Sequence, residues 1–211
     1  MNRSVNQGNF TVHLRPRSVP ERALALFYTF CLGGVSFLAF LVLGTTGILL
    51  MFHYQPGPTA GYNSVLNLAS VITYGPLFRN LHFWAGQLMV LTVVLHMLRV
   101  VWTHAYRPPR ELNWVVGVSL LVLTLTLDFT GYLLRGSQES GAAATVAVHL
   151  LQLLPGIGNN WAVSFLGRPS ALSGSTLAVY VWHCVALPGL TFHLQSYHFW
   201  RIRKDGGVKP L

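Results

Sequence analysis

Four long apolar runs set the limits on how this chain can fold. They cover roughly residues 30–53, 79–104, 113–134 and 177–203, and each has about 20 residues or more. A helix rises about 1.5 Å per residue, so each run can cross a hydrocarbon core of about 30 Å. Only 9% of the 211 residues are charged, whereas a typical soluble domain has about 25%. The sequence therefore predicts an integral membrane protein with four spans.

The basic residues predict how these spans are oriented. The formal net charge is +9, and most lysines and arginines precede the first run, end the second or follow the fourth. Positive residues are retained on the cytoplasmic side of a membrane. Both termini are therefore expected on the cytoplasmic or stromal side, in a bacterial inner membrane or a thylakoid. Because topology explains the charge, no nucleic-acid partner is expected.

The organisation between the runs predicts a single membrane domain. Residues 1–29 are expected to form an N-terminal segment on the cytoplasmic side. Residues 30–211 are expected to form an all-α, four-helix membrane bundle. Surface helices are expected in the first link, TAGYNSVLNLASVITYGPLFRN, and in the long third link, residues 136–176. Pro108 and Pro109 should end the second helix, and Glu111 suits the first turn of the third.

Histidines recur at regular intervals in the second and fourth runs. His96 follows His82 by fourteen positions, and His198 follows His183 by fifteen. At about 100° and 1.5 Å per residue, a step of fourteen returns nearly to the same helix face about 21 Å further along. An imidazole is costly to bury without a partner. Two antiparallel helices marked in this way could clamp two haems, one above the other.

Glycines repeat this interval in the other two runs. Gly47 follows Gly33 by fourteen positions, and Gly131 follows Gly117 by the same step. Glycine lets a helix backbone approach a flat macrocycle closely, at a cost in helix propensity. The matching interval on all four runs favours haem binding over ordinary packing.

Two arginines lie close to the candidate ligand histidines in sequence. Arg79 precedes His82 by three positions, and Arg99 follows His96 by three. Each could pair with haem propionates, or simply extend its charge toward the membrane surface. The remaining histidines are expected to be unliganded: His13, His53, His104, His149 and His193.

Several motifs resemble the cytochrome b6 family, the N-terminal, haem-binding half of cytochrome b. They are FCLGG, RPPRELNWVVGV, FTGY, LPGIG, LSGSTLAVYVWH and FHLQSYHFWRIRKDGGVKPL. The resemblance runs from Cys31 to Leu211. It implies two haem b groups with two histidine ligands each, His82 with His183 on the outer side and His96 with His198 on the inner side. Such six-coordinate irons pass single electrons.

The resemblance also implies a third haem. In b6-type proteins the cysteine of FCLGG holds a c-type haem by one thioether, which would place this haem at Cys31, with Arg203 a candidate for its propionates. From the residues alone, Cys31 and Cys184 are each expected to be small buried residues.

The function implied is that of an electron-carrying subunit rather than a complete enzyme. The chain would move electrons across the membrane between quinone sites in a quinol oxidoreductase of the cytochrome bc or b6f type, in respiration or photosynthesis. Its expected partners are a subunit equivalent to the C-terminal half of cytochrome b (subunit IV), a Rieske iron–sulfur protein, a c-type cytochrome, quinone and lipid. The complex is expected to be dimeric.

One segment departs from the family. Where the family continues GYxLPWDQ after the third helix, this chain reads GYLLRGSQ. Asp128 adds a carboxylate at membrane depth, expected either to pair with Arg79 or Arg135 or to handle protons at an altered quinone site. Glu139 is the second candidate proton acceptor.

Two other functions remain open. The altered segment favours a dihaem membrane anchor of a different respiratory oxidoreductase that exchanges electrons with the quinone pool. A haem-free helical scaffold or transporter is the third hypothesis.

Overall fold

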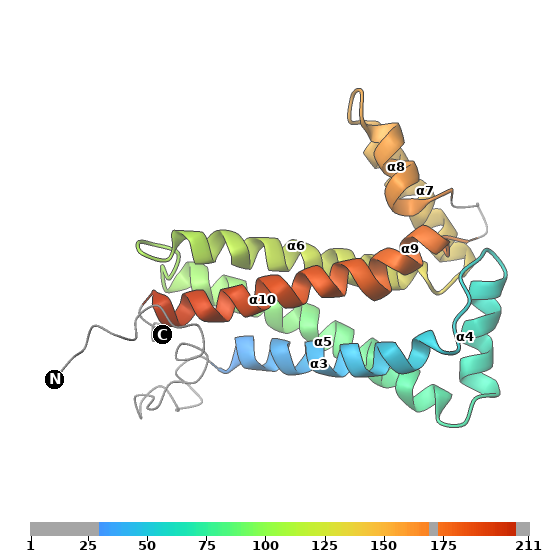
Figure 1. Ribbon diagram of the computed structural model, residues 1–211, viewed down its shortest axis with the longest axis horizontal. Coiled ribbons are helices and arrows are strands. Elements are labelled where there is room, and N and C mark those ends of the chain that lie inside the picture. The colour runs from blue at the N-terminus through green and yellow to red at the C-terminus, as the bar shows by residue number, and fades with distance from the viewer. Residues whose placement is uncertain (1–29, 169–172, 206–211) are drawn as a thin grey trace. The chain divides into compact units, whose positions relative to one another are not determined.

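The computed structural model describes residues 30–168 and 173–205, and these residues are almost entirely helical (Figure 1). The predicted all-α class is confirmed, and the expected N-terminal segment, residues 1–29, lies outside the described residues. The elements are α3 (Leu32–Met51), α4 (Ala60–Ser70), α5 (Gly75–Trp102), α6 (Glu111–Leu133), α7 (Gln138–Gln152), α8 (Gly158–Leu166), α9 (Leu177–Val181), the π-helix η2 (Trp182–Ala186) and α10 (Leu187–Lys204).

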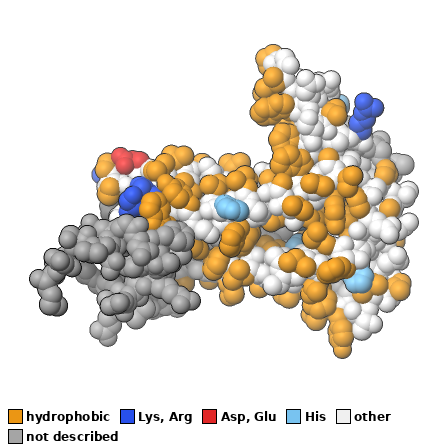
Figure 2. Space-filling view, viewed as in Figure 1, with side chains coloured by type: hydrophobic (Ala, Val, Ile, Leu, Met, Phe, Trp, Pro, Cys, Tyr) orange, Lys and Arg blue, Asp and Glu red, His pale blue; other side chains and the backbone are white. Residues whose placement is uncertain are grey.

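Four helical stretches are long and apolar enough to cross a membrane. They are α3, α5, α6 and the run formed by α9, η2 and α10. Apolar side chains cover much of the visible surface (Figure 2), as expected where lipid is the solvent. The chain is therefore an integral, multi-pass membrane protein. The second span begins at Gly75, ahead of the predicted run, because the preceding segment GPLF is itself helical.

The structure divides into two compact units, and each contains part of all four spanning helices. The first unit contains Leu88–Thr124 together with the described residues up to Leu38 and from Leu190 onward. The second contains Ala39–Gln87 and the described residues within Leu125–Gly189. Each unit holds one of the two predicted histidine pairs. That residues 30–211 act as one domain stays a prediction.

The altered segment GYLLRGSQ forms a tight corner between α6 and α7 in the second unit. Gly136 has a φ of +67°, a conformation that favours glycine. A Cβ on Gly136 would lie 2.6 Å from the backbone nitrogen of Tyr62. Ser137 caps α7, because its hydroxyl accepts a hydrogen bond from the backbone N–H of Ser140. Glycine and serine here thus build a helix-to-helix corner packed against α4.

Helices occupy both long links, as predicted. The first link contains α4, and the third contains α7 and α8, which pack against each other. α7 and α8 also expose large apolar side chains, among them Val146, Leu150, Trp161 and Phe165. Their location at the membrane surface stays a prediction.

A half-buried tyrosine, Tyr54, joins the end of α3 to the segment that enters the fourth span. The Tyr54 hydroxyl donates to the Leu134 carbonyl at 2.7 Å and lies 2.7 Å from the Ser175 hydroxyl. Burial raises the pKa of Tyr54 to about 12, so the phenol stays protonated. Because Ser175 immediately precedes Thr176, which caps α9, this contact helps to fix where the helical run that carries His183 begins.

Candidate functional site

In the second unit, the imidazole rings of His82 and His183 lie next to each other. Their ring centroids are 6.3 Å apart and the rings are inclined at 69°. His82 comes from α5 and His183 from η2, so two residues far apart in sequence meet at one point. His96 of α5 and His198 of α10 do the same in the first unit, where their centroids are 6.5 Å apart at 82°.

The separation of each pair fits a metal ion between the two rings. A metal–imidazole bond is about 2.0–2.1 Å and a ring nitrogen lies about 1.2 Å from the ring centre, so two rings that bound one ion would have their centroids at most about 6.4–6.6 Å apart. The observed 6.3 and 6.5 Å are close to this range. A pair of histidines on opposite sides of one ion suits a haem, whose macrocycle supplies the other four nitrogens.

Two threonines orient the rings of the His82–His183 pair. The Thr46 hydroxyl lies 2.9 Å from His82 Nδ1, and the Thr130 hydroxyl lies 3.1 Å from His183 Nδ1. Each hydroxyl also donates to a carbonyl one turn back in its own helix, at 2.7 and 2.8 Å respectively. Since the hydroxyl proton is used there, the imidazole Nδ1–H is the donor to the threonine oxygen. This tautomer leaves Nε2 free to bind a metal.

Each of the four glycines lies against one of the four histidine rings. A Cβ on Gly33 would be 3.6 Å from Cε1 of His96, and one on Gly117 would be 3.6 Å from Cε1 of His198. The approach is closer in the second unit, where a Cβ on Gly47 would be 3.3 Å from His82 and one on Gly131 only 2.8 Å from His183. The repeated interval therefore has a second steric reason: the glycines leave room for the ligand rings themselves.

A cavity of about 150 Å³ opens beside His96 and His198 in the first unit. It is lined from all four spanning helices, and Gly33 and Gly117 are among its lining residues. The donor pair and the glycine-lined space fit a haem at this position.

Some of the arginines near the His96–His198 pair line this cavity and others do not. Arg99 and Arg110 line it. Arg203, expected near a third haem, is exposed and is not among the described residues that line the cavity. Arg99 thus lies beside this histidine pair, and the roles of Arg99 and Arg203 toward haem carboxylates stay predictions.

The π-helix explains why the two histidine intervals differ by one residue. In a regular α-helix, a step of fifteen overshoots four turns by about 60°, whereas a step of fourteen falls short by about 40°. A π-turn takes up about one additional residue, and η2 contains His183 itself. The fourth span therefore has the side-chain register of a fourteen-residue interval. This is how both pairs close at nearly the same centroid distance.

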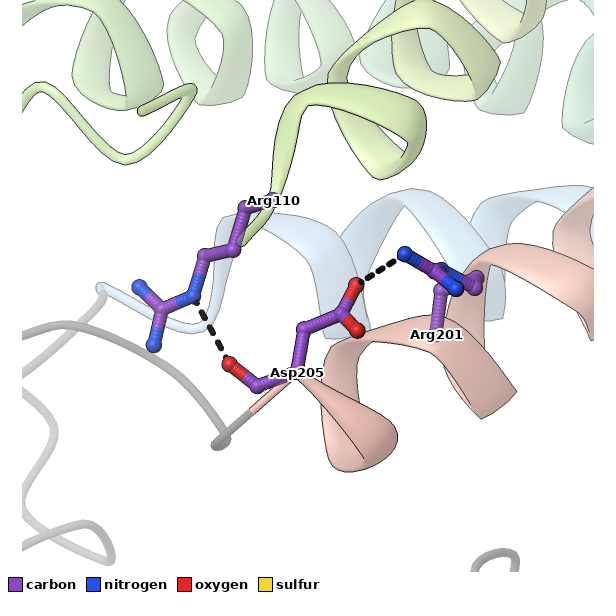
Figure 3. Close-up of polar contacts among 3 residues, drawn as sticks. All are labelled: Arg110, Arg201 and Asp205. Carbon is purple, nitrogen blue, oxygen red and sulfur yellow. Dashed lines mark hydrogen bonds and ion pairs between the residues drawn. The ribbon is translucent and has the colours of Figure 1, made fainter. Parts of the chain in front are cut away.

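An ion-paired cluster that the sequence did not reveal holds Arg110 at the cavity (Figure 3). Arg110 Nε donates to the main-chain oxygen of Asp205 at 3.3 Å. The Asp205 carboxylate pairs with Arg201, one turn back, at 2.9 Å. The cluster joins the start of α6 to the end of α10. The Arg110 contact is tertiary, so no local motif predicts it. The Arg201–Asp205 pair is a local contact between positions four residues apart.

The expected pairing of Asp128 with an arginine is wrong. Among residues 30–168 and 173–205, Asp128 forms no ion pair with Arg79 or Arg135. Its carboxylate instead accepts a hydrogen bond from Gln87 Nε2 at 3.3 Å. Arg135 lies over the ring of Tyr132, 5.3 Å from its centroid.

Glu139 is a chemically available carboxylate. It is exposed in the first turn of α7. A hydrogen bond from the Ser137 side chain lowers its pKa, so Glu139 is ionised at neutral pH.

The two cysteines differ in exposure. Cys31 is exposed just before α3, where burial was expected from the residues alone. Cys184 is half-buried and packs against the apolar core of the second unit. The histidines expected to be unliganded belong to neither facing pair in the part of the chain that the structure describes; His13 falls outside that part.

The sequence of this chain is similar to those of known proteins. A family model described as cytochrome b/b6/petB matches residues 19–206. Cytochrome b6 of Heliobacterium modesticaldum is 39% identical over 204 residues, which cover 97% of this chain and 95% of that protein. The menaquinol:cytochrome c reductase cytochrome b subunit of Bacillus subtilis is 34% identical over 185 residues, covering 87% and 83%.

A solved structure shares the fold. A chain of a hyperthermophilic respiratory complex III matches 87% of this chain with a TM-score of 0.74 and 23% identity. The match covers 49% of that chain, so this protein spans about half its length.

Proposed function

Because the chain belongs to the cytochrome b/b6 family, we propose that it carries electrons across the membrane as the haem-bearing subunit of a cytochrome bc- or b6f-type quinol oxidoreductase. The observation that carries this proposal is the facing histidine pair in each unit, at 6.3 and 6.5 Å between ring centroids. The Bacillus relative is a subunit of a menaquinol:cytochrome c reductase, which supports quinol as the electron donor.

The residues that would hold two haem b groups follow from the site. His82 with His183 would hold one haem, and His96 with His198 would hold the other. A haem with two histidine ligands supplies reversible one-electron transfer and has no open position for a substrate. The four facing glycines leave the ligand rings their space.

The propionates of these haems would be held by two arginines. Arg99 lines the cavity beside His96 and His198 and would neutralise carboxylates there. Arg79, one turn before His82 in α5, would do the same at the other pair.

Cys31 would hold a third haem through a single thioether. Its exposure supports this role, because a buried, packed thiol is inert. Cys31 also stands two positions before Gly33, which lies against the ring of His96. Arg203, exposed near the end of α10, is the candidate for the propionates of this haem.

The chain would act only within a complex. Its partners would be a Rieske iron–sulfur protein, a c-type cytochrome and a subunit equivalent to the C-terminal half of cytochrome b, in a dimeric assembly. The distribution of basic residues favours a cytoplasmic or stromal location for both termini.

An outer quinone site in this chain would have two candidate proton acceptors, Asp128 and Glu139. Asp128 is exposed on α6 and hydrogen-bonded only weakly to Gln87, at 3.3 Å, so it could accept a proton from a quinol. Glu139 is the second candidate. The altered α6–α7 corner favours the alternative function, a dihaem anchor of a different respiratory oxidoreductase, which needs no such site.

Oxidant-induced reduction distinguishes these two functions. Membranes that contain the complex are supplied with quinol, the haems are allowed to equilibrate, and a pulse of ferricyanide is added. In a bc-type complex the pulse draws one electron to the oxidant and sends the other into the b haems, so b-haem absorbance rises. In a simple dihaem anchor the pulse only oxidises the b haems, and the absorbance falls.

A further inference from the structure

Buried polar side chains gather beside the His96–His198 pair in the first unit. They come from all four spanning helices, and each is at most 8% exposed. We call them the polar cluster: Ser36 of α3, Thr92 of α5, Thr124 of α6, and Thr191 and Gln195 of α10. All except Thr92 line the cavity that also contains the two ligand rings.

The polar cluster lies closer to the middle of the spanning helices than His96 and His198 do. Thr92 precedes His96 by four positions, and Gln195 precedes His198 by three. Both histidines are near the ends of their helices, so these steps lead one turn inward. Hydroxyl and amide groups are costly in hydrocarbon unless they are hydrogen-bonded. The free-energy cost of burying this cluster therefore depends on which of its polar groups are hydrogen-bonded.

The hydroxyl protons of the cluster are largely used within the protein. Ser36 Oγ donates to Thr92 Oγ1 at 2.9 Å, and Thr92 Oγ1 donates to the carbonyl of Leu88 at 2.8 Å. Thr124 Oγ1 donates to the carbonyl of Leu120 at 2.9 Å. These hydroxyl oxygens keep lone pairs that can accept a further hydrogen bond.

Gln195 is not satisfied in this way. Its amide oxygen is buried and makes no hydrogen bond among the described residues. A haem bound at the neighbouring pair cannot supply the missing donor, because its pyrrole nitrogens bind iron and its ionised propionates only accept. Water can supply the donor, since a buried water makes two to four hydrogen bonds in a polar cavity.

We propose that the polar cluster binds ordered water against the haem held by His96 and His198, and that this water lowers the reduction potential of that haem. The inference rests on the proposed function. Oxidised haem iron carries one more positive charge than reduced iron. Water and amide dipoles directed at the haem stabilise that charge, and the polarity of the surrounding shell is a known control on potential.

The test compares Gln195→Met, which removes the amide but keeps the chain length, with Gln152→Met as a matched control. Gln152 is exposed at the end of α7 and does not line the cavity, so the same exchange is made away from the haem site. The complex is purified from its membrane, its haem content is measured, and its b haems are titrated potentiometrically. Redox difference infrared spectra are recorded in ordinary and in ¹⁸O-labelled water.

Gln195→Met is expected to move the one-electron equilibrium of one b haem tenfold toward the reduced form, a rise of about 59 mV. The potential of the other haem, and both potentials in the Gln152→Met control, should stay unchanged. An ¹⁸O-sensitive band present in the native complex should be lost in Gln195→Met. If both b haems are present but no potential moves, or the native complex has no such band, the inference is overturned.

Failed assembly of the variant and absence of haem b from the native complex are two further possible outcomes. If Gln195→Met fails to assemble, Thr124→Val removes another member of the cluster and is judged by the same potential and band. If the native complex contains no haem b at all, the proposed function fails and the inference fails with it. Intact haems with unshifted potentials refute the water site alone.

Discussion

Gly131 lies directly against the ring of His183: a Cβ on this glycine would be 2.8 Å from His183 Cε1. No other glycine beside a ligand histidine is so close. At Gly33, for example, the corresponding distance to His96 is 3.6 Å, an ordinary contact. The four glycines recur at the same interval, but they differ in the space left for a Cβ. Alanine substitutions at these glycines should therefore differ in their effect on haem binding.

Gly131→Ala is expected to reduce haem occupancy at the His82–His183 pair at least tenfold, because disturbing the surroundings of a metal ligand costs about 10–100-fold in affinity. Gly33→Ala should keep both haems. Gly44→Ala is the control, since a Cβ there meets nothing within 4 Å. Haem per polypeptide, measured by pyridine haemochrome, checks this, and equal occupancy in all three variants would contradict it.

Thr130→Val should change the haem at His183 without removing it. The variant deletes one acceptor of the imidazole Nδ1–H, so the ligand becomes less basic and stabilises oxidised iron less well. The midpoint potential of that haem should rise. Thr45→Val is the control, because the Thr45 hydroxyl donates to carbonyls of its own helix. A potential that does not move would rule out the hydrogen bond as a tuning element.

Deletion of Val185 should be tolerated. It shortens the interval between His183 and His198 from fifteen to fourteen and allows the π-helix η2 to become a regular α-turn, with both pairs preserved. Deletion of Val90 in α5 is the matched control, because that helix has no π-turn to absorb it and one pair should lose its haem. Optical spectra of the two purified variants check this. Loss of a haem in both would show that η2 does not serve as the register correction.

Tyr54→Phe should lower thermal stability. It leaves the Leu134 carbonyl without this donor, and the Ser175 hydroxyl keeps only its bond from the Gly57 N–H. An unsatisfied buried polar group costs about 1–3 kcal/mol. The folded pKa of Tyr54, about 12, is above its ordinary value of 10, so its contribution is complete below pH 10 and is lost as the pH rises toward 12. Melting curves of the wild type and the variant should therefore differ at pH 8 and converge in strong alkali. A constant difference would contradict the pH assignment.

Helix geometry made much of this structure predictable. The fourteen-residue interval of His82 and His96 fixes their relative direction on any α-helix, so a facing partner could be expected on another helix at each depth. The apolar content of the long links likewise predicted helices such as α4 and α7.

The remaining features depend on tertiary context. A threonine in an apolar helix usually bonds only its own backbone, so nothing local marked Thr46 as the acceptor for His82. The π-turn at His183 has no sequence signature apart from an interval of fifteen in place of fourteen. Asp128 was expected to find an arginine because charge pairing is the common solution in membranes, yet the neighbour that meets it on α5 is Gln87.

A reduced-minus-oxidised spectrum with a pyridine haemochrome assay, before and after acid–acetone extraction, tests the central claim most directly. We expect two b haems that extract and one haem that stays on the polypeptide and disappears in Cys31→Ala. Two extractable haems with none retained would remove the thioether at Cys31 and leave both histidine pairs as haem sites. A purified protein with no haem would contradict the account at its centre.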